Sequence, residues 1–558
     1  MRHFLDTQST SLLLSIVLLI TVTYNVVGFP DTPGGSFAVE VNGKTHKLTT
    51  TPATFPLWSA NVAGASASSA YKYVKLSDTG VAVQKESFKR SFANKKATAT
   101  VNEFFQRQIT QNNLPKVPQV YKDVRSKAAP NFDETQIGTI HVTADPAIFD
   151  DMVKNPLDEE RKAIKASFRF INANNVYSVE EVKMKVSGHG SRKFKKLSFR
   201  LKFDDDKGET FFNHPIIKLR SEAFDPTLIR EKLYIDVLNS AGIRTTQGTW
   251  TRLYVNGQAY GFYLMVDDVE PPLLSNLFHN GELKPKQLGS LYQMGSHVAG
   301  LEATLQYNGS RTADYHPGTY ANKNLGANTK EEPMAQLISF FKDLQDFNPA
   351  LPGGVAYWSK RLNLEDYLRQ MAVEYLGGSW DMYWWKGNNF FMYFNPTTNV
   401  WQWVPTDFDS TFSNGNLKDV EVPYKQFAAS RLRRKGKDHP LITKLIYKNK
   451  EINGQFEKTL LTLAKGVFNP KALEPRINAY EKMIQDEVKW DLSINRSKNP
   501  GRTFGYTLDD FHKSITGPVK TVNNGIKPWI SYRAKDVPKQ IASGKSALAS
   551  QVFEEDEF

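Results

Sequence analysis

The chain of 558 residues carries a formal net charge of +13 at neutral pH, and 40% of its residues are hydrophobic. This length and apolar content are enough for about two to four domains with packed cores. Because the chain has no cysteine, disulfides, thiolate zinc sites and cysteine nucleophiles are all excluded. The positive charge favours contact with anionic polymers, phosphorylated substrates or nucleotide phosphates, and no nucleic-acid-binding module is recognisable in the sequence.

Residues 1–28 are predicted to form a secretory signal peptide. An apolar run from Leu12 to Val27 follows a short basic start, and the small residues Val26 and Gly28 suit cleavage before Phe29. Polar residues interrupt the run, so it is a poor membrane span, and an uncleaved signal anchor is the alternative. We therefore expect a secreted protein with no transmembrane span in the mature chain.

Two acceptor sequons and the C-terminal tail also bear on the secretory route. Asn308-Gly-Ser and Asn495-Arg-Ser are predicted N-glycosylation sites. Residues 541–558 end in an acidic tail, whereas a lipid-anchor signal needs about 10–20 terminal apolar residues. We therefore expect no lipid anchor of that type.

Three regions lie between the signal peptide and the tail. Residues 29–130 predict a β-rich module, because alternating apolar and polar runs end at turns such as Asn42-Gly43. Residues 131–290 predict a second β-rich lobe, with one helix that starts at Asp225-Pro226 between its strand pairs. Residues 291–540 are predicted to be mainly helical, and they carry the catalytic and metal site.

The strongest chemical signal lies in one continuous segment of the helical region. Asp381 follows the end of a predicted helix and precedes the pair Asn388 and Asn389. A β-hairpin comes next, and its second strand leads to Asp407 and Asp409. Such a set of carboxylates and amides suits phosphate transfer, in which one carboxylate handles the acceptor hydroxyl and the others hold Mg²⁺.

The spacing in this segment departs from that of ordinary protein kinases. Their catalytic Asp and Asn lie five residues apart in one loop, and the metal-binding Asp comes later. Here Asp381 and Asn388 are seven residues apart, although the order of the groups is the same. The glycine-rich loop of ordinary kinases is also absent. The segment therefore predicts an unusual phosphotransferase loop.

Several motifs in matching order resemble the CotH family of spore-coat kinase-like proteins, over roughly residues 137–540, and most of all its fungal, Mucorales-type invasin branch. The matching segments are Gly190-Ser-Arg-Lys-Phe-Lys-Lys-Leu-Ser-Phe-Arg-Leu-Lys-Phe203, Lys218-Leu-Arg-Ser-Glu-Ala-Phe-Asp-Pro-Thr-Leu-Ile-Arg-Glu-Lys232, Tyr254-Val-Asn-Gly-Gln-Ala-Tyr-Gly-Phe-Tyr263, Asn388-Asn-Phe-Phe-Met-Tyr-Phe394 and Trp403-Val-Pro-Thr-Asp-Phe-Asp-Ser-Thr-Phe412. The resemblance implies an α+β, atypical protein-kinase-like fold of two lobes, to which the N-terminal β-rich module is added. It also implies a secreted atypical kinase, at the cell surface or spore wall, that binds ATP and Mg²⁺ or Mn²⁺.

The resemblance also implies roles for individual residues. Asp381 is expected to be the catalytic carboxylate, and the expected metal ligands are Asn389, Asp407 and Asp409.

A second set of residues is expected to bind the nucleotide. Lys196 would contact its phosphates, and Glu231 on the predicted helix would pair with Lys196. The base is expected between the rings of Tyr292 and Trp403, with Trp401 as the alternative to Trp403 because both lie on one strand face.

Three functions remain open on the sequence. The first is a kinase that phosphorylates Ser or Thr of spore-coat, wall or other secreted proteins. The second is a non-catalytic, invasin-like adhesin that binds host cell-surface receptors, since a fold does not determine a function. The third is a glycosidase that uses Asp381 and Asp409 as a carboxylate pair about 5–10 Å apart, which leaves Lys196 and the Asn pair without a role.

Overall fold

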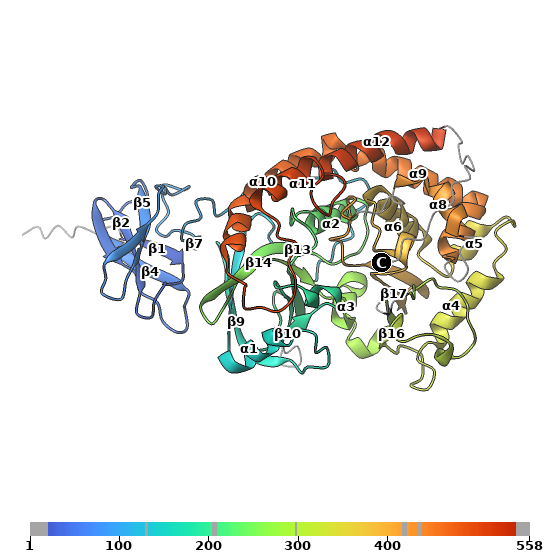
Figure 1. Ribbon diagram of the computed structural model, residues 1–558, viewed down its shortest axis with the longest axis horizontal. Helices are drawn as coiled ribbons and strands as arrows, with labels where there is room; N and C mark the ends of the chain where they lie inside the picture. The colour runs from blue at the N-terminus through green and yellow to red at the C-terminus, as the bar shows by residue number, and fades with distance from the viewer. Residues whose placement is uncertain are drawn as a thin grey trace, which may run out of the picture. The chain divides into compact units, whose positions relative to one another are not determined.

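The computed structural model describes residues 21–128, 132–203, 209–295, 298, 300–415, 421–431 and 438–542. The chain folds into two compact units, the first made of residues up to Gln111 together with 171–176, and the second of the remainder. Figure 1 labels the elements of both units. The boundary at Gln111 lies before the predicted one at residue 130.

The first unit contains two antiparallel-rich sheets, with strand orders β4-β1-β7 and β3-β2-β5-β6. Alternating aromatic and β-branched residues form these strands and build one core between them. The strands are β1 (Thr21–Val27), β2 (Ser36–Val41), β3 (Lys44–Lys47), β4 (Leu57–Ala63), β5 (Tyr71–Leu76), β6 (Ala82–Lys85) and β7 (Glu103–Phe104). The expectation of a β-rich N-terminal region is confirmed.

Strand β1 overlaps the predicted signal peptide. It pairs with β4 along its whole length and with β7 at its end. Its alternate residues Val22, Tyr24 and Val26 are buried in the core of the first unit. Cleavage before Phe29 would remove the central strand of this three-stranded sheet. The signal peptide and its cleavage point stay predictions, and residues 1–20 lie outside the described part.

The second unit is built around a closed seven-stranded barrel with strand order β10-β11-β12-β14-β13-β8-β9. Its inward-facing residues are apolar and form a core of their own. The strands are β8 (Gly138–Ala144), β9 (Ile164–Ile171), β10 (Val176–Ser187), β11 (Ser198–Lys202), β12 (Ile216–Arg220), β13 (Gly248–Val255) and β14 (Gln258–Asp267). Helix α1 (Pro146–Lys154) joins β8 to β9, and helix α2 (Arg230–Ser240) joins β12 to β13.

Helix α2 begins later than its sequence predicts. The predicted start was Asp225-Pro226, but Leu228 adopts a left-handed φ of 52° and the helix begins at Arg230. The Asp225 side chain still caps the N-terminal end of α2, because its carboxylate accepts hydrogen bonds from the backbone N–H groups of Ile229 and Arg230. All eleven residues of α2 are buried, so the helix is a central element of this unit rather than a surface cover.

The remaining elements form a second sheet and a helical layer, as Figure 1 shows in green to red. The sheet has the order β16-β15-β17-β18. Its strands are β15 (Leu291–Met294), β16 (Tyr320–Asn324), β17 (Phe390–Asn395) and β18 (Val400–Pro405). The helices are α3 (Pro271–His279), α4 (Ala335–Asp346), α5 (Gly354–Ser359), α6 (Leu364–Gly377), α7 (Tyr383–Lys386), α8 (Tyr424–Arg431), the π-helix η6 (Leu441–Lys448), α9 (Lys450–Gly466), α10 (Pro470–Ser493), α11 (Leu508–Thr516) and α12 (Ile526–Ala542).

The helical layer and part of the barrel share one apolar core. One apolar core includes α2, α6, α9 and α10 together with β17 and β18. The α+β class predicted from the sequence is confirmed. None of the helices in the described part of the chain has the length and apolar character that a membrane span needs.

Candidate active site

The loop that carries Asp381 directly follows helix α6 and is hydrogen-bonded to it. Gly378 ends this helix in the left-handed conformation, with a φ of 56°, which glycine adopts without strain. The buried carboxyl of Glu374 then accepts the backbone N–H of Trp384 at 3.0 Å. Ser379 donates its hydroxyl to the Tyr234 hydroxyl at 3.0 Å, which ties the loop to α2. These contacts fix the position of the loop that carries Asp381.

Burial raises the pKa of Glu374 to about 8, so the group is neutral at pH 7. In the unfolded chain the same carboxyl ionises near pH 4.5. The folded state therefore retains the proton between pH 4.5 and 8, and stability falls across this window by about 1.4 kcal/mol per pH unit. We expect Glu374→Gln to remove this loss, because the neighbouring Gln370 amide can rotate to meet the new one. Urea unfolding at pH 5 and pH 8 measures how the unfolding free energy changes with pH, and the exposed Glu365→Gln is the control. If both variants showed the same change with pH, Glu374 would not be its source.

Asp381 lies among three donors. Asn388 Nδ2 donates to Oδ1 at 3.2 Å, and Asn389 Nδ2 donates to Oδ2 at 3.1 Å. Lys386 Nζ lies 3.3 Å from Oδ1. Burial raises the pKa of Asp381; Lys386 opposes this shift and the Asp407 carboxylate adds to it. The carboxyl is thus fixed in direction while its side chain stays 24% exposed.

The hairpin β17–β18 brings the predicted metal ligands close to this loop. Asn389 immediately precedes β17, and the backbone N–H of Thr406, after β18, donates to its carbonyl at 3.1 Å. Asn389 and Asp407 both have positive φ, 58° and 64°, a strained geometry that concentrates at functional sites. Phe408 is buried against Tyr234, with ring centroids 4.9 Å apart, so the two flanking carboxylates remain outside the core.

Arg220, at the end of β12, is the cation that these carboxylates surround. Its Nη2 lies 2.5 Å from Asp407 Oδ1 and 3.3 Å from Asp409 Oδ2. Its Nε lies 2.5 Å from Glu231 Oε2 and 3.2 Å from Glu222 Oε1. We call these five residues the Arg220 cluster. The cluster joins the barrel, helix α2 and the segment after β18 in one network of charges.

The charges of the Arg220 cluster do not balance. Burial raises the pKa of Glu231 to about 7, and it raises those of Glu222 and Asp409 well above their ordinary values. Burial alone would lower the pKa of Arg220, but the surrounding carboxylates raise it well above its usual value. One guanidinium thus faces four carboxyl groups, an arrangement that a further cation would stabilise.

The donors present suit a hard divalent cation. Mg²⁺ in nucleotide enzymes is held by one or two carboxylates and by substrate phosphates and water, rather than by an all-protein cage. Asp407 and Asp409, with side chains 38% and 14% exposed, and the amide of Asn389 offer such oxygens. No group of three or more His, Cys, Asp or Glu side chains arranged to hold a metal ion occurs within the described ranges. The protein residues would therefore supply only part of the coordination.

Lys196 and Glu231 do not pair, so that prediction is wrong. Lys196 Nζ donates to the Phe262 carbonyl at 2.5 Å and to Asp491 Oδ2, on α10, at 3.0 Å. Glu231 pairs with Arg220 instead. The reason is the order of the barrel: β12 and α2 follow each other directly, whereas Lys196 precedes β11 and lies beside α10.

The two predicted base-binding rings are packed inside the protein. Trp403 is 3% exposed and stacks on Phe390 with centroids 4.0 Å apart. Tyr292 is fully buried and donates its hydroxyl to the Pro333 carbonyl at 2.9 Å. Trp401, the alternative, is also 3% exposed and lies 5.9 Å from the Tyr292 ring. In this conformation none of the three rings presents a free face to a nucleotide base.

Both glycosylation sequons lie at accessible positions. The side chains of Asn308 and Asn495 are exposed. The backbone N–H of Asn308 donates to the Tyr315 hydroxyl at 3.0 Å. Glycosylation at these two positions stays a prediction.

Arg220 and Glu222 were not among the residues predicted from the sequence. Both occur in the segment Lys218-Leu-Arg-Ser-Glu222, where a strand ends shortly before a helix that carries Glu231 in its first turn. An arginine at the end of a strand, followed by a helix that begins with a glutamate, was the signal that could have pointed to this pair.

Comparison with known proteins agrees with the motifs. Invasin CotH3 of Rhizopus delemar is 29% identical over 557 residues, covering 95% of this chain and 86% of its own length. Spore coat protein homolog 1 of the same fungus is 26% identical over 565 residues, covering 97% and 86%. Inner spore coat protein H of Bacillus subtilis is 23% identical over 308 residues, covering 54% and 76%. The model of the CotH kinase protein family matches residues 184–536, more than half of the chain, and the chain therefore belongs to the CotH family.

Proposed function

We propose that this chain is a CotH-type protein kinase that transfers the γ-phosphate of ATP to Ser or Thr of spore-coat, wall or other secreted proteins. The observation that carries the proposal is the Arg220 cluster beside Asp381. In protein kinases a strand-borne cation pairs with a glutamate on the next helix, and an aspartate after a later strand pair binds the metal. Arg220, Glu231 and Asp409 lie in that order here.

Each residue of the site has a distinct task under this proposal. Asp381 orients the acceptor hydroxyl and receives its proton, and the amides of Asn388 and Asn389 fix the direction of its carboxylate. Asp407 and Asp409, with Asn389, would hold Mg²⁺ or Mn²⁺. The bound ion would neutralise charge on the transferred phosphate.

Arg220 has two tasks under the same proposal. It holds Asp407 and Asp409 at fixed positions by ion pairs, and its guanidinium is a cation that can face the phosphates of ATP. The glycosidase alternative uses neither Arg220 nor the Asn pair, and it therefore leaves most of the polar groups of the site unexplained.

The names of the relatives favour a location outside the cell. Because relatives are named invasins and spore coat proteins, we infer a secreted chain at the cell surface or spore wall. The same names favour one second candidate, a non-catalytic adhesin that binds host cell-surface receptors. The retained carboxylates of the Arg220 cluster favour the kinase, because an adhesin has no need of partly exposed acidic groups around a buried arginine.

The test is transfer of labelled γ-phosphate from ATP by the purified chain, with Mg²⁺, with Mn²⁺ and with excess chelator. We expect incorporation into the chain itself or into extracted wall protein, and its complete loss with chelator. The matched variants are Asp409→Asn, in the cluster, and Asp509→Asn, an exposed residue of α11. Activity in Asp509→Asn but not in Asp409→Asn supports the kinase. No incorporation, together with no rise in Tm on adding ATP and metal, would leave the adhesin as the better function.

A further inference from the structure

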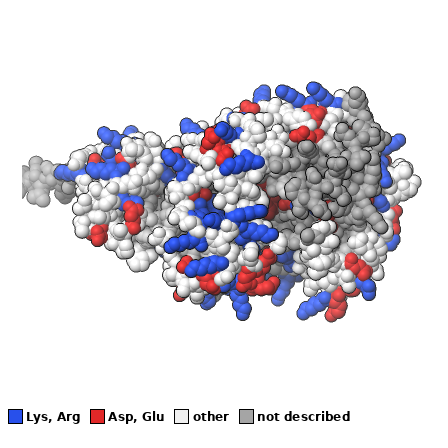
Figure 2. Space-filling model, viewed as in Figure 1, with Lys and Arg blue, Asp and Glu red and all other residues white. Residues whose placement is uncertain are grey.

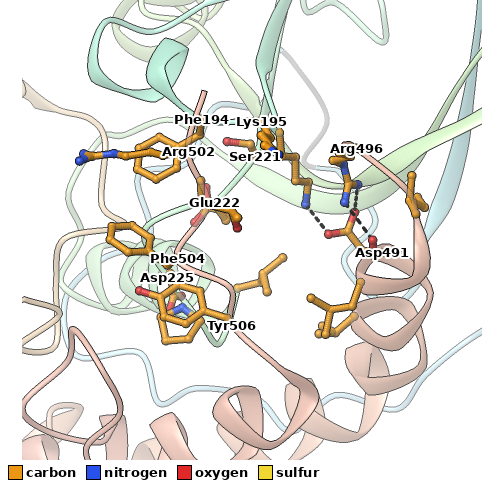
Figure 3. A pocket seen from close by; sticks show the side chains of 18 of the residues that line it. Phe194, Lys195, Ser221, Glu222, Asp225, Asp491, Arg496, Arg502, Phe504 and Tyr506 are labelled. Atoms are coloured by element: carbon orange, nitrogen blue, oxygen red, sulfur yellow. Dashed lines mark hydrogen bonds and ion pairs between the residues drawn. The ribbon is translucent and has the colours of Figure 1, made fainter. Parts of the chain in front are cut away.

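A cavity of about 340 Å³ lies behind the turn that carries Glu222, in the second unit. Its walls are the end of α10, the segment 494–507 that follows it, the turn 221–226 after β12, and residues 194–196 before β11. Figure 3 shows these walls and the side chains that face the cavity. The cavity is separate from Asp381 and the hairpin β17–β18, none of whose residues line it.

One side of the cavity is aromatic. Phe504 stacks on Tyr506 with centroids 5.3 Å apart, and Phe194 lies 5.3 Å from Phe504. The aliphatic side chains of Leu228 and Val488 complete this apolar side. A ligand with an aromatic or large apolar group therefore suits the cavity.

Each of the three acidic residues in the walls has a cation close by. Glu222 Oε1 lies 3.2 Å from Arg220 Nε, and burial raises the pKa of Glu222 well above its ordinary value, which favours its neutral form. Asp225 contacts Arg230 at 2.5 Å, and Asp491 contacts both Lys196 at 3.0 Å and Arg496 at 2.6 Å. These pairs cannot attract a further charge strongly, because each carboxylate has its own cation close by.

Two cations in the walls have no such partner. Neither Lys195 nor Arg502 has a carboxylate within ion-pair distance in the part of the chain that the structure describes. Arg502 instead lies over the Phe194 ring, 4.9 Å from its centroid. Lys520, which does not line the cavity, lies beside the segment 494–507, since its Nζ donates to the Gly505 carbonyl at 2.9 Å. Figure 2 shows many Lys and Arg side chains over the barrel, with groups of acidic side chains among them. The cavity therefore suits an anionic ligand that also carries aromatic rings.

The chain itself contains a segment of this chemistry. Its residues Phe553-Glu-Glu-Asp-Glu-Phe558 place four acidic side chains between two phenylalanines. Opposite charge and aromatic character thus match the cavity on both counts.

The chain between α12 and the acidic segment is long enough for that segment to reach the cavity. Helix α12 starts close to the cavity, because Arg230, which pairs with the wall residue Asp225, approaches the Asn524 carbonyl at 3.4 Å. The 17 residues of α12 span about 25 Å. The ten residues 543–552 can extend over about 33 Å, which is enough to return along the helix.

We propose that the acidic segment 553–558 docks in this cavity of its own chain, with a phenylalanine ring against Phe504 and Tyr506 and its carboxylates at Lys195 and Arg502. The docked segment would lie against the turn 221–226, whose Glu222 belongs to the Arg220 cluster. The inference does not depend on the proposed kinase activity, because it concerns a separate cavity and a binding event within the chain.

Because the chain has no cysteine of its own, only the introduced pair can form a disulfide within it. In the full chain, Ser497→Cys at the cavity is combined with Glu557→Cys in the tail, and disulfide formation is followed under mild oxidation. The control pair combines Glu557→Cys with Lys458→Cys, an exposed position on α9, the helix that packs against α12. A disulfide needs Cα atoms within about 7 Å, so only a docked tail brings the first pair together often. We expect the first pair to close about tenfold faster than the control.

Two further comparisons decide the outcome. Arg502→Glu, or Phe553→Ser with Phe558→Ser, is expected to slow closure of the first pair to the control rate. All of these positions lie in the tail or at exposed residues, and the Tm of each variant checks that it is folded. Equal rates for the two pairs, or a rate that these substitutions do not change, would overturn the proposal. A closure rate that rises with protein concentration would also overturn it, because the tail would then be reaching a second copy.

Discussion

An Arg220→Met chain is expected to lose about 3–5 kcal/mol of unfolding free energy and, if the chain is the proposed kinase, all measurable phosphate transfer. Removing the guanidinium leaves Glu222, Glu231, Asp407 and Asp409 around a buried site with no cation among them. The loss should grow with pH, because a raised pKa keeps part of these carboxyls neutral at low pH. We therefore expect a smaller loss at pH 5 than at pH 8.

Tryptophan fluorescence in urea measures this effect well. Nine of the ten tryptophans lie in the second unit, and only Trp58 lies in the first. The control is Lys513→Met, which removes one cation of an exposed pair with Asp509 and should change the free energy by less than about 1 kcal/mol. Arg220→Lys keeps the charge without the forked geometry and should recover only part of the loss. The same loss at pH 5 and pH 8 would show that the carboxyls are not the cause.

Asp381→Asn is expected to lower kcat for phosphate transfer by about 10²–10⁴-fold, if the chain is the proposed kinase. The amide has the same shape and keeps one oxygen for one of the two donors, and the other asparagine amide can rotate to offer its own oxygen to the new NH2 group, so Tm should change little. The KM for ATP should also change little, because the carboxylate acts on the acceptor hydroxyl rather than on the nucleotide.

The pH dependence provides a second readout for Asp381. Burial raises its pKa, so the proton-accepting form is lost as the pH falls through a value above 3.8, and activity should fall with it. The Asp381→Asn variant should lack this acidic decline in its residual activity. A variant that keeps the parent's kcat, or the parent's acidic decline, would exclude Asp381 as the proton acceptor.

Strand β1 lies within the segment predicted as a signal peptide, and the overlap has a physical cause. A signal peptide and a buried strand are both apolar, so the run from Leu12 to Val27 fits either of them. The distinguishing feature is periodicity: from Val22 to Val26 alternate residues are buried, as in a strand with one face on a core. Strand β1 pairs with β4 and β7, whose residues lie far from it in the chain, and the local sequence does not show which strands it will pair with.

The aromatic residues show a similar limit. Tyr292 on β15 and Trp403 on β18 both lie opposite Met392 of the strand between them, β17, and the sequence could indicate that both rings face the interior. Whether an interior ring contacts a ligand or another ring depends on packing. Here Phe390 and Tyr383 fill the space beside Trp403, with centroids 4.0 and 5.0 Å away.

By itself the sequence determined the α+β class, the family and the grouping of Asp381, Asn389, Asp407 and Asp409, because these depend on local order and on periodicity along one short segment. Only the tertiary structure decided that Arg220, and not Lys196, pairs with Glu231. Both cations precede α2 in the sequence, and both lie close to a barrel strand. Which of them meets the helix depends on the order in which the strands close the barrel, and that order is set by hydrogen bonds between residues far apart in the chain.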